Sequence, residues 1–88
     1  MREETNNILK HDFRELALRE RERLGLTQRQ MAETLVMSER SYADIESGVS
    51  ACGALTVTLL LISLPNPNDF LQKIRKDFDS LYIMEEVG

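Results

Sequence analysis

The sequence has little of what several protein classes require. It contains a single cysteine, Cys52, so neither an internal disulfide nor a zinc site built on cysteines is possible. The segment MREETNNILKHD at the start lacks the apolar stretch of a signal peptide. The most hydrophobic run, residues 54–64, is shorter than the roughly 20 residues that a membrane-spanning helix needs. From these absences we expect a cytoplasmic protein.

Positive charge is also scarce. Eleven lysine and arginine residues stand against 15 aspartate and glutamate residues, for a formal net charge of −4. Proteins that bind nucleic acid chiefly by neutralising phosphates are usually basic, so this balance lowers that expectation. It does not exclude DNA binding, because the position of the charges matters more than their sum.

Catalytic patterns are missing as well. The chain has no glycine-rich phosphate loop, no cluster of metal ligands and no nucleophile with a suitably spaced base. His11 is an isolated histidine at the start of a predicted helix, and Cys52 suits a small buried apolar side chain. We therefore expect no enzyme, no cofactor and no metal.

What the sequence does contain is helical periodicity. With 88 residues, of which 42% are hydrophobic and 30% charged, it suits one small globular domain. We predict an all-α fold of five helices, with a polar N-terminal arm at 1–11, a single domain at 12–83 and a tail at 84–88. In the first helix, from Asp12 to Gly25, the apolar side chains should share one side and the charged run RERER at 19–23 should face water. Those apolar residues are Phe13, Leu16, Ala17 and Leu24.

Two short helices follow, with a three-residue turn between them, over residues 27–47. TQRQ, which begins at Thr27, fits a capping box, and Ser38 fits the cap of the next helix. Ala32 is small enough for two helices to cross closely, and Tyr42 and Ile45 have the spacing of inward anchors. The pattern predicts a helix-turn-helix. Its second helix would turn Glu39, Arg40, Ala43, Asp44 and Ser47 away from the core.

Two further helices complete the predicted domain. Residues 51–63 are almost all apolar or small, so we expect a helix packed on most sides, although the alternation in LTVTL also suits a strand. The PNPN sequence at 65–68 predicts a turn, with Asn68 capping a fifth helix over 69–82. The apolar stripe of that helix can exceed what the core covers; it comprises Phe70, Ile74, Phe78, Leu81 and Tyr82.

These segments resemble the Cro/C1-type, or lambda-repressor-like, helix-turn-helix regulators of the XRE group. LGLTQRQMAETL followed by a capped helix that ends in IESG is typical of that family, and the pattern is closest to N-terminal domains of the lambda-repressor type. The likeness extends without a gap from Phe13 to Leu64 and resumes in the fifth helix. It implies a transcriptional regulator, in the usual case a repressor, that binds a palindromic operator in double-stranded DNA as a homodimer.

The resemblance also assigns roles to individual residues. Gln28 matches a glutamine that touches phosphate, Glu39 and Arg40 match positions that read base edges, and Asp44 matches a further groove-facing position. The predicted DNA-contacting set is Gln28, Ser38, Glu39, Arg40, Ser41, Asp44, Ser47 and Ser50. The predicted dimer contacts in the fifth helix are Ile74, Phe78, Leu81 and Tyr82.

The sequence departs from the family in ways that keep another interpretation open. Val36 occupies a turn position where glycine is usual, so the turn either avoids positive φ or is strained. REETNN replaces the basic N-terminal arm, and we expect no effector response of the kind that a second, ligand-binding domain provides. Glu39 and Asp44 suit a solvated acidic face as well as base reading. The alternative is therefore a protein-interaction module that uses the acidic third helix against a basic partner, and Arg40 could then pair with Asp44.

Overall fold

The structure is a computed structural model that describes the backbone of residues 2–87 and the side chains of residues 3–80. Five α-helices follow one another along the chain, and no strand occurs between residues 2 and 87. The all-α, five-helix prediction is confirmed, and the alternative of a strand within LTVTL is wrong. The helices are α1 (Arg2–Leu24), α2 (Gln28–Thr34), α3 (Glu39–Glu46), α4 (Ala54–Ser63) and α5 (Pro67–Val87).

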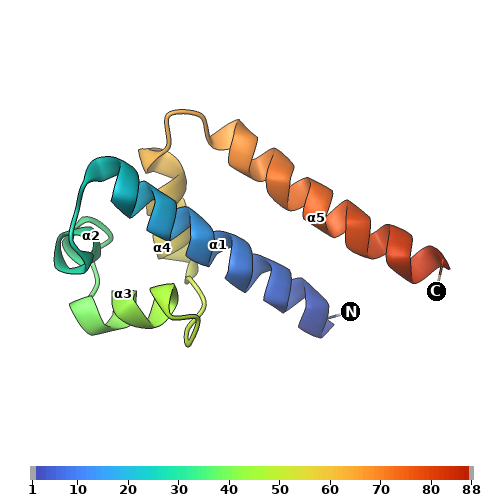
Figure 1. The fold of residues 1–88 in the computed structure, drawn as a ribbon, viewed down its shortest axis with the longest axis horizontal. Helices are drawn as coiled ribbons and strands as arrows, with labels where there is room; N and C mark the ends of the chain where they lie inside the picture. The colour runs from blue at the N-terminus through green and yellow to red at the C-terminus, as the bar shows by residue number, and fades with distance from the viewer. Residues whose placement is uncertain (1, 88) are drawn as a thin grey trace.

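Helix α1 is the element on which the others assemble. It contacts α3, α4 and α5, while α2 packs mainly on α3 (Figure 1). Helix α5 runs back along α1 in the opposite direction, and the rings of Phe13 and Phe70 meet edge to face with centroids 5.0 Å apart. The buried core draws on all five helices; it comprises Leu16, Ala17, Met31, Ala32, Leu35, Tyr42, Leu60 and Phe70.

The first helix is longer than predicted. It begins at Arg2 rather than at Asp12, so residues that we expected to form a loose arm are its first turns. Directly after these turns α1 is joined to α5, because Lys73 reaches across to Asp12 with 3.0 Å between Nζ and Oδ1. The periodicity of a local segment cannot predict a contact between residues so far apart in sequence.

Two expectations about the end of α1 are wrong. Leu24 is 41% exposed rather than part of the core, because α1 ends there and Gly25 turns the chain away at φ +68°. Within RERER, Glu20 is buried rather than solvated. Its carboxylate accepts two hydrogen bonds from Arg23 and one from the hydroxyl of Ser63 in α4. This charged run therefore ties α1 to α4.

Helix α4 is covered on one side only. Thr56 and Leu60 are buried, whereas Leu55 and Ile62 are 66% and 73% exposed, so the expectation that α4 is packed on most sides is wrong. High hydrophobicity predicted burial but could not say how many neighbours the fold supplies. Helix α5 starts at Pro67, a residue suited to a first helical position, so Asn68 lies inside its first turn rather than capping it.

Over the described residues, none of the helices is both long enough and apolar enough to cross a membrane.

Candidate nucleic-acid interface

The start of α2 is fixed by the predicted capping box. The Thr27 hydroxyl accepts a hydrogen bond from the backbone N–H of Gln30 at 3.1 Å, and the Gln30 side chain accepts from the Thr27 N–H at 2.9 Å. Both bonds satisfy donors that have no partner inside the helix. The register of α2 is therefore set by local sequence.

Helices α1, α2 and α3 all end in the same hydrogen-bonded turn. In each, an N–H two or three residues past the helix donates to the carbonyl five residues earlier: Leu26 to Arg21, Met37 to Ala32, and Val49 to Asp44, at 2.9–3.1 Å. This Schellman motif needs a left-handed residue, which is usually glycine. Gly25 and Gly48 fill that place at φ +68° and +83°.

Val36 fills the same place in the turn of the helix-turn-helix, with φ +57°. Its side chain is 74% exposed, so no burial of that side chain offsets the conformational cost. A left-handed conformation costs an L-residue on the order of 1–2 kcal/mol, and branching at Cβ worsens the crowding. Of the two possibilities that the sequence left open, the strained turn is the one observed.

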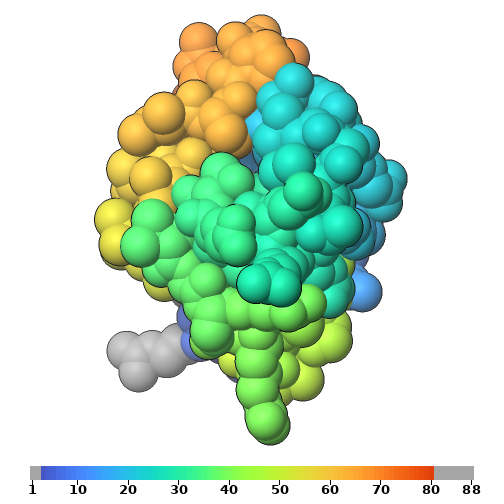
Figure 2. Space-filling model, turned by 90° about the vertical axis from the view of Figure 1, so that its left-hand side faces the viewer, coloured from blue at the N-terminus to red at the C-terminus, as the bar shows by residue number. Residues whose placement is uncertain are grey.

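Helix α3 is oriented by its two predicted anchors. Tyr42 is fully buried and Ile45 is 5% exposed, which turns the opposite side of α3 outward. Glu39, Arg40 and Ser41, in its first turn, are all exposed. Figure 2 looks onto this side of the molecule, where α2 lies in the middle of the surface and the first part of α3 below it.

Arg40 has no hydrogen bond or ion pair with any of residues 3–80. In particular, its possible pairing with Asp44, one helical turn away, is not formed. Its guanidinium group therefore keeps all its donors available for an external acceptor. Neighbouring Ser38 is partly committed, because its hydroxyl accepts from the Ser41 N–H at 3.1 Å and donates to the Ser41 hydroxyl at 2.8 Å.

The residues at the far end of α3 support the turn after the helix. The backbone carbonyl of Asp44 accepts hydrogen bonds from the Ser47 hydroxyl and from the N–H groups of Val49 and Ser50, at 2.9–3.1 Å. Asp44 is half-buried, and both serines are exposed. Apart from half-buried Asp44, the predicted site residues of α3 and its flanks are therefore exposed.

Glu46 is a residue whose role the sequence did not reveal. It faces inward beside Tyr42, with a side chain only 8% exposed, and accepts hydrogen bonds from Arg21 at 2.6 and 3.1 Å. The Tyr42 hydroxyl also donates to it, and Arg14 donates to its backbone carbonyl at 2.6 Å. A detectable signal existed, because Glu46 follows buried Tyr42 by four residues and so shares its side of the helix.

This inward position changes the electrostatics of α3. Burial alone would raise the pKa of Glu46, but hydrogen bonds from Arg21, Tyr42 and Gln28 outweigh it and hold the pKa below its usual value. The Tyr42 hydroxyl shows the opposite effect, since burial and the adjacent carboxylate raise its pKa. Glu46 is therefore ionised and neutralised by Arg21, and the outward acidic residues of α3 are Glu39 and Asp44.

Gln28, predicted to touch phosphate, has an internal partner instead of a free amide. Its Nε2 donates to Glu46 Oε1 at 2.9 Å, which ties the first turn of α2 to the last turn of α3. The side-chain oxygen of Gln28 is not used by that bond. A phosphate contact by Gln28 stays a prediction.

Among residues 3–80, no group of three or more histidine, cysteine or acidic side chains could hold a metal ion. Of the predicted dimer contacts, Ile74 packs against the core and Phe78 is half-buried. The side chains of Leu81 and Tyr82 lie outside the described residues.

Comparison with known proteins agrees with this geometry. A family model described as helix-turn-helix matches residues 18–61, which include the end of α1, all of α2 and α3, and most of α4. Neither the curated proteins nor the solved structures with which the chain was compared gave a match. The matched segment is half of the chain and contains the capped α2, the turn at Val36 and the outward-facing α3. The chain therefore belongs to the Cro/C1-type, XRE-like helix-turn-helix family of DNA-binding transcription regulators.

Proposed function

We propose that the protein is a sequence-specific repressor that places α3 in the major groove of a palindromic operator and binds it as a homodimer. The observation that carries the proposal is Arg40. Arg40 is exposed in the first turn of a helix whose buried side chains, Tyr42 and Ile45, fix it to the core. It has no hydrogen-bond or ion-pair partner among residues 3–80. A fixed backbone with a free guanidinium is what direct base reading requires.

The outward side chains of α3 define the bases that it would select. Arg40 can donate two hydrogen bonds to the O6 and N7 atoms of guanine, and Glu39 or Asp44 can accept from the N4 amine of cytosine. A good bidentate contact is worth about 1–3 kcal/mol of discrimination. Carboxylates close to phosphates lower affinity, so we propose a reader that gains selectivity at the expense of binding strength.

A second copy supplies the affinity that one acidic domain lacks. We propose that α5 pairs across the two-fold axis through Ile74 and Phe78, with Leu81 and Tyr82 continuing the contact. The half-burial of Ile74 and Phe78 supports this, because each side chain keeps apolar surface that α1 does not cover. Two α3 helices related by a two-fold axis call for an operator with inverted half-sites.

We propose repression rather than activation because occupation of an operator needs only DNA and a second copy. Activation requires a further surface that recruits the transcription machinery. The protein-interaction alternative is weakened by Glu46, because that residue faces inward and leaves α3 with a smaller acidic surface.

Selection from random DNA at two salt concentrations tests the proposal. The wild-type chain should enrich an inverted repeat with guanine at a fixed position in each half-site. The salt dependence reports how many phosphates are neutralised. Arg40→Ala should lose the preference for that guanine and retain the helical content of the wild type.

Arg75→Ala is the matched control, since Arg75 is an exposed arginine on α5. It removes the same charge and should leave the selected sequence unchanged. Failure of the wild-type chain to enrich any sequence at low salt would overturn the proposal. Capture of a basic protein that is lost on Asp44→Lys would favour the interaction module in its place.

A further inference from the structure

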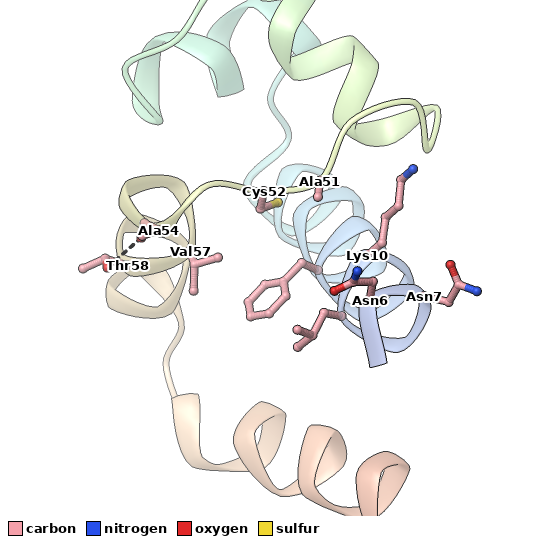
Figure 3. A pocket seen from close by; sticks show the side chains of 10 residues that line it. Asn6, Asn7, Lys10, Ala51, Cys52, Ala54, Val57 and Thr58 are labelled. Carbon is pink, nitrogen blue, oxygen red and sulfur yellow. Dashed lines mark hydrogen bonds between the residues drawn. The ribbon is translucent and has the colours of Figure 1, made fainter. Parts of the chain in front are cut away.

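A cavity opens on the side of α1 that faces α4. Its volume is about 760 Å³, within the roughly 300–1,000 Å³ typical of small-molecule sites. It is open to solvent, and three segments line it: the first half of α1, the chain between α3 and α4, and the start of α4 (Figure 3). Its lining residues are Asn6, Asn7, Leu9, Lys10, Phe13, Ala51, Cys52, Ala54, Val57 and Thr58.

The interior of this cavity is apolar. Leu9 and Phe13 line it from α1, Val57 from α4 and Cys52 from the connecting chain. Thr58 adds no free donor, because its hydroxyl bonds to the Ala54 carbonyl at 2.9 Å. A ligand body that is aliphatic or aromatic would be desolvated here at little cost.

Polar groups gather on the α1 side of the cavity. Asn6, Asn7 and Lys10 lie there, and Lys10 extends past Ala51 toward the outer edge (Figure 3). Among the lining residues, Lys10 is the one with a permanent positive charge, and no acidic residue lines the cavity. Lys10 has no ion pair with residues 3–80, although acidic residues outnumber basic ones in this chain. An unpaired cation beside an apolar chamber selects a negatively charged head group.

We propose that this cavity binds an amphipathic monocarboxylate, with its apolar body between Phe13 and Val57 and its carboxylate on Lys10. The asparagine amide of Asn6 can donate a second hydrogen bond to the same carboxylate.

Such a ligand would act on the helix that reads DNA. Ala51 and Cys52 form part of the cavity wall and belong to the connection that leads from the end of α3 to α4. A ligand that holds this connection shifts the equilibrium between positions of α3 by its difference in affinity for them. This effect on DNA binding rests on the proposed function, whereas binding of the carboxylate does not.

The single thiol of the chain provides a local readout of binding. Cys52 lines the cavity and is half-buried, and burial raises the pKa of its thiol. The rate of its alkylation by iodoacetamide can be measured with decanoate as the probe, below the concentration at which decanoate forms micelles. Decanoate should slow alkylation at least fivefold and raise the unfolding temperature. Decylamine, which has the same chain and the opposite charge, should do neither.

Two variants localise the effect. Lys10→Gln should raise the decanoate concentration for half-protection about tenfold, as expected for loss of a charged hydrogen-bond partner. Lys76→Gln, an exposed lysine on α5, should leave it unchanged. Val57→Phe should fill the chamber and abolish protection, while circular dichroism reports whether the helices remain.

Three results would overturn the proposal: no protection by decanoate, equal protection by decylamine, or a Lys10→Gln variant that responds like the wild type. None of these measurements uses DNA. The carboxylate site can therefore fail while the operator proposal holds, and the reverse is also possible.

Discussion

Arg21 in α1 and Glu46 at the end of α3 form a bidentate ion pair, with 2.6 Å from Nε to Oε2 and 3.1 Å from NH2 to Oε1. The same carboxylate holds Gln28 at the start of α2, so one side chain joins the three helices that form the DNA-binding unit. Tyr42 completes the cluster from within α3. The angle of α3 on the body of the protein is therefore fixed by a polar network as well as by apolar packing.

Replacing Glu46 by glutamine tests the strength of this network. Glu46→Gln keeps the shape of the side chain and removes its charge, so Arg21 loses a charged partner in a poorly solvated site. We expect a loss of about 1.5–3 kcal/mol in the free energy of unfolding at pH 7. Urea denaturation of both proteins measures it. Glu15→Gln is the control, because Glu15 makes only long surface pairs, with His11 and Arg19 at 3.7 Å each, and should change stability by less than ~0.5 kcal/mol.

The same pair predicts how stability depends on pH. The pKa of Glu46 is lower in the folded chain than its ordinary value of 4.5, so the folded state binds this proton less readily than the unfolded state. Its contribution is complete above pH 4.5 and is lost as the pH falls through the lowered value. The difference in stability between wild type and Glu46→Gln should therefore narrow under acid. A constant difference from pH 7 to pH 3 would contradict the assignment.

Val36→Gly should stabilise the protein. Glycine removes the cost of the left-handed conformation, about 1–2 kcal/mol. It also destabilises the folded state by roughly 0.5–1 kcal/mol, because the unfolded chain gains conformational freedom. The net gain should be on the order of 0.5–1 kcal/mol. Val49→Gly supplies the comparison, because Val49 is also exposed and lacks a positive φ. A gain at Val49 equal to that at Val36 would rule out relief of backbone strain as the cause.

The local features of this fold could be predicted from the sequence because short-range chemistry determines them. The capping box at Thr27, the stop at Gly48 and the anchors Tyr42 and Ile45 depend on residues within one or two helical turns. The direction of Arg40 follows from those anchors by helical geometry alone. Most of the exposed surface of α3 can therefore be inferred from the order of its residues.

The features that could not be predicted depend on contacts between distant segments. Glu20 was expected to face water and Glu46 was given no role, yet both carboxylates are buried, where Arg23 and Arg21 pair with them. Helix α1 packs on α5, which begins at Pro67, far away in sequence. The exposure of Leu55 and Ile62 reflects the number of helices available to cover α4, which no periodicity encodes.

The outward carboxylates of α3 should lower the affinity for DNA and increase the discrimination between the operator and random DNA. Glu39→Gln and Asp44→Asn each remove a negative charge near the expected path of the phosphates. We expect each to strengthen binding to random duplex DNA at low salt about threefold to fivefold, as for a charge interaction of ~1 kcal/mol. Discrimination between the operator and random DNA should fall. Titration by fluorescence anisotropy gives both numbers.

A variant on α5 separates local charge from net charge in that experiment. Asp79→Asn changes the net charge by the same amount, and Asp79 is exposed on the helix that we assign to dimer contacts. Its affinity for random DNA should stay within twofold of the wild type. Equal strengthening by all three variants would mean that net charge alone governs the effect and that α3 is not the surface that faces DNA.

Phe78→Glu should separate the two copies of the proposed dimer. Phe78 is half-buried in one copy, and a carboxylate there would have to be desolvated against its symmetry mate. Sedimentation equilibrium should give the wild type twice the chain mass of 10.1 kDa and the variant that mass alone. Gln72→Glu adds the same charge at an exposed position of α5 and should remain dimeric. Circular dichroism shows whether the variant is still folded. A wild-type chain that sediments at 10.1 kDa would remove the basis for a palindromic operator.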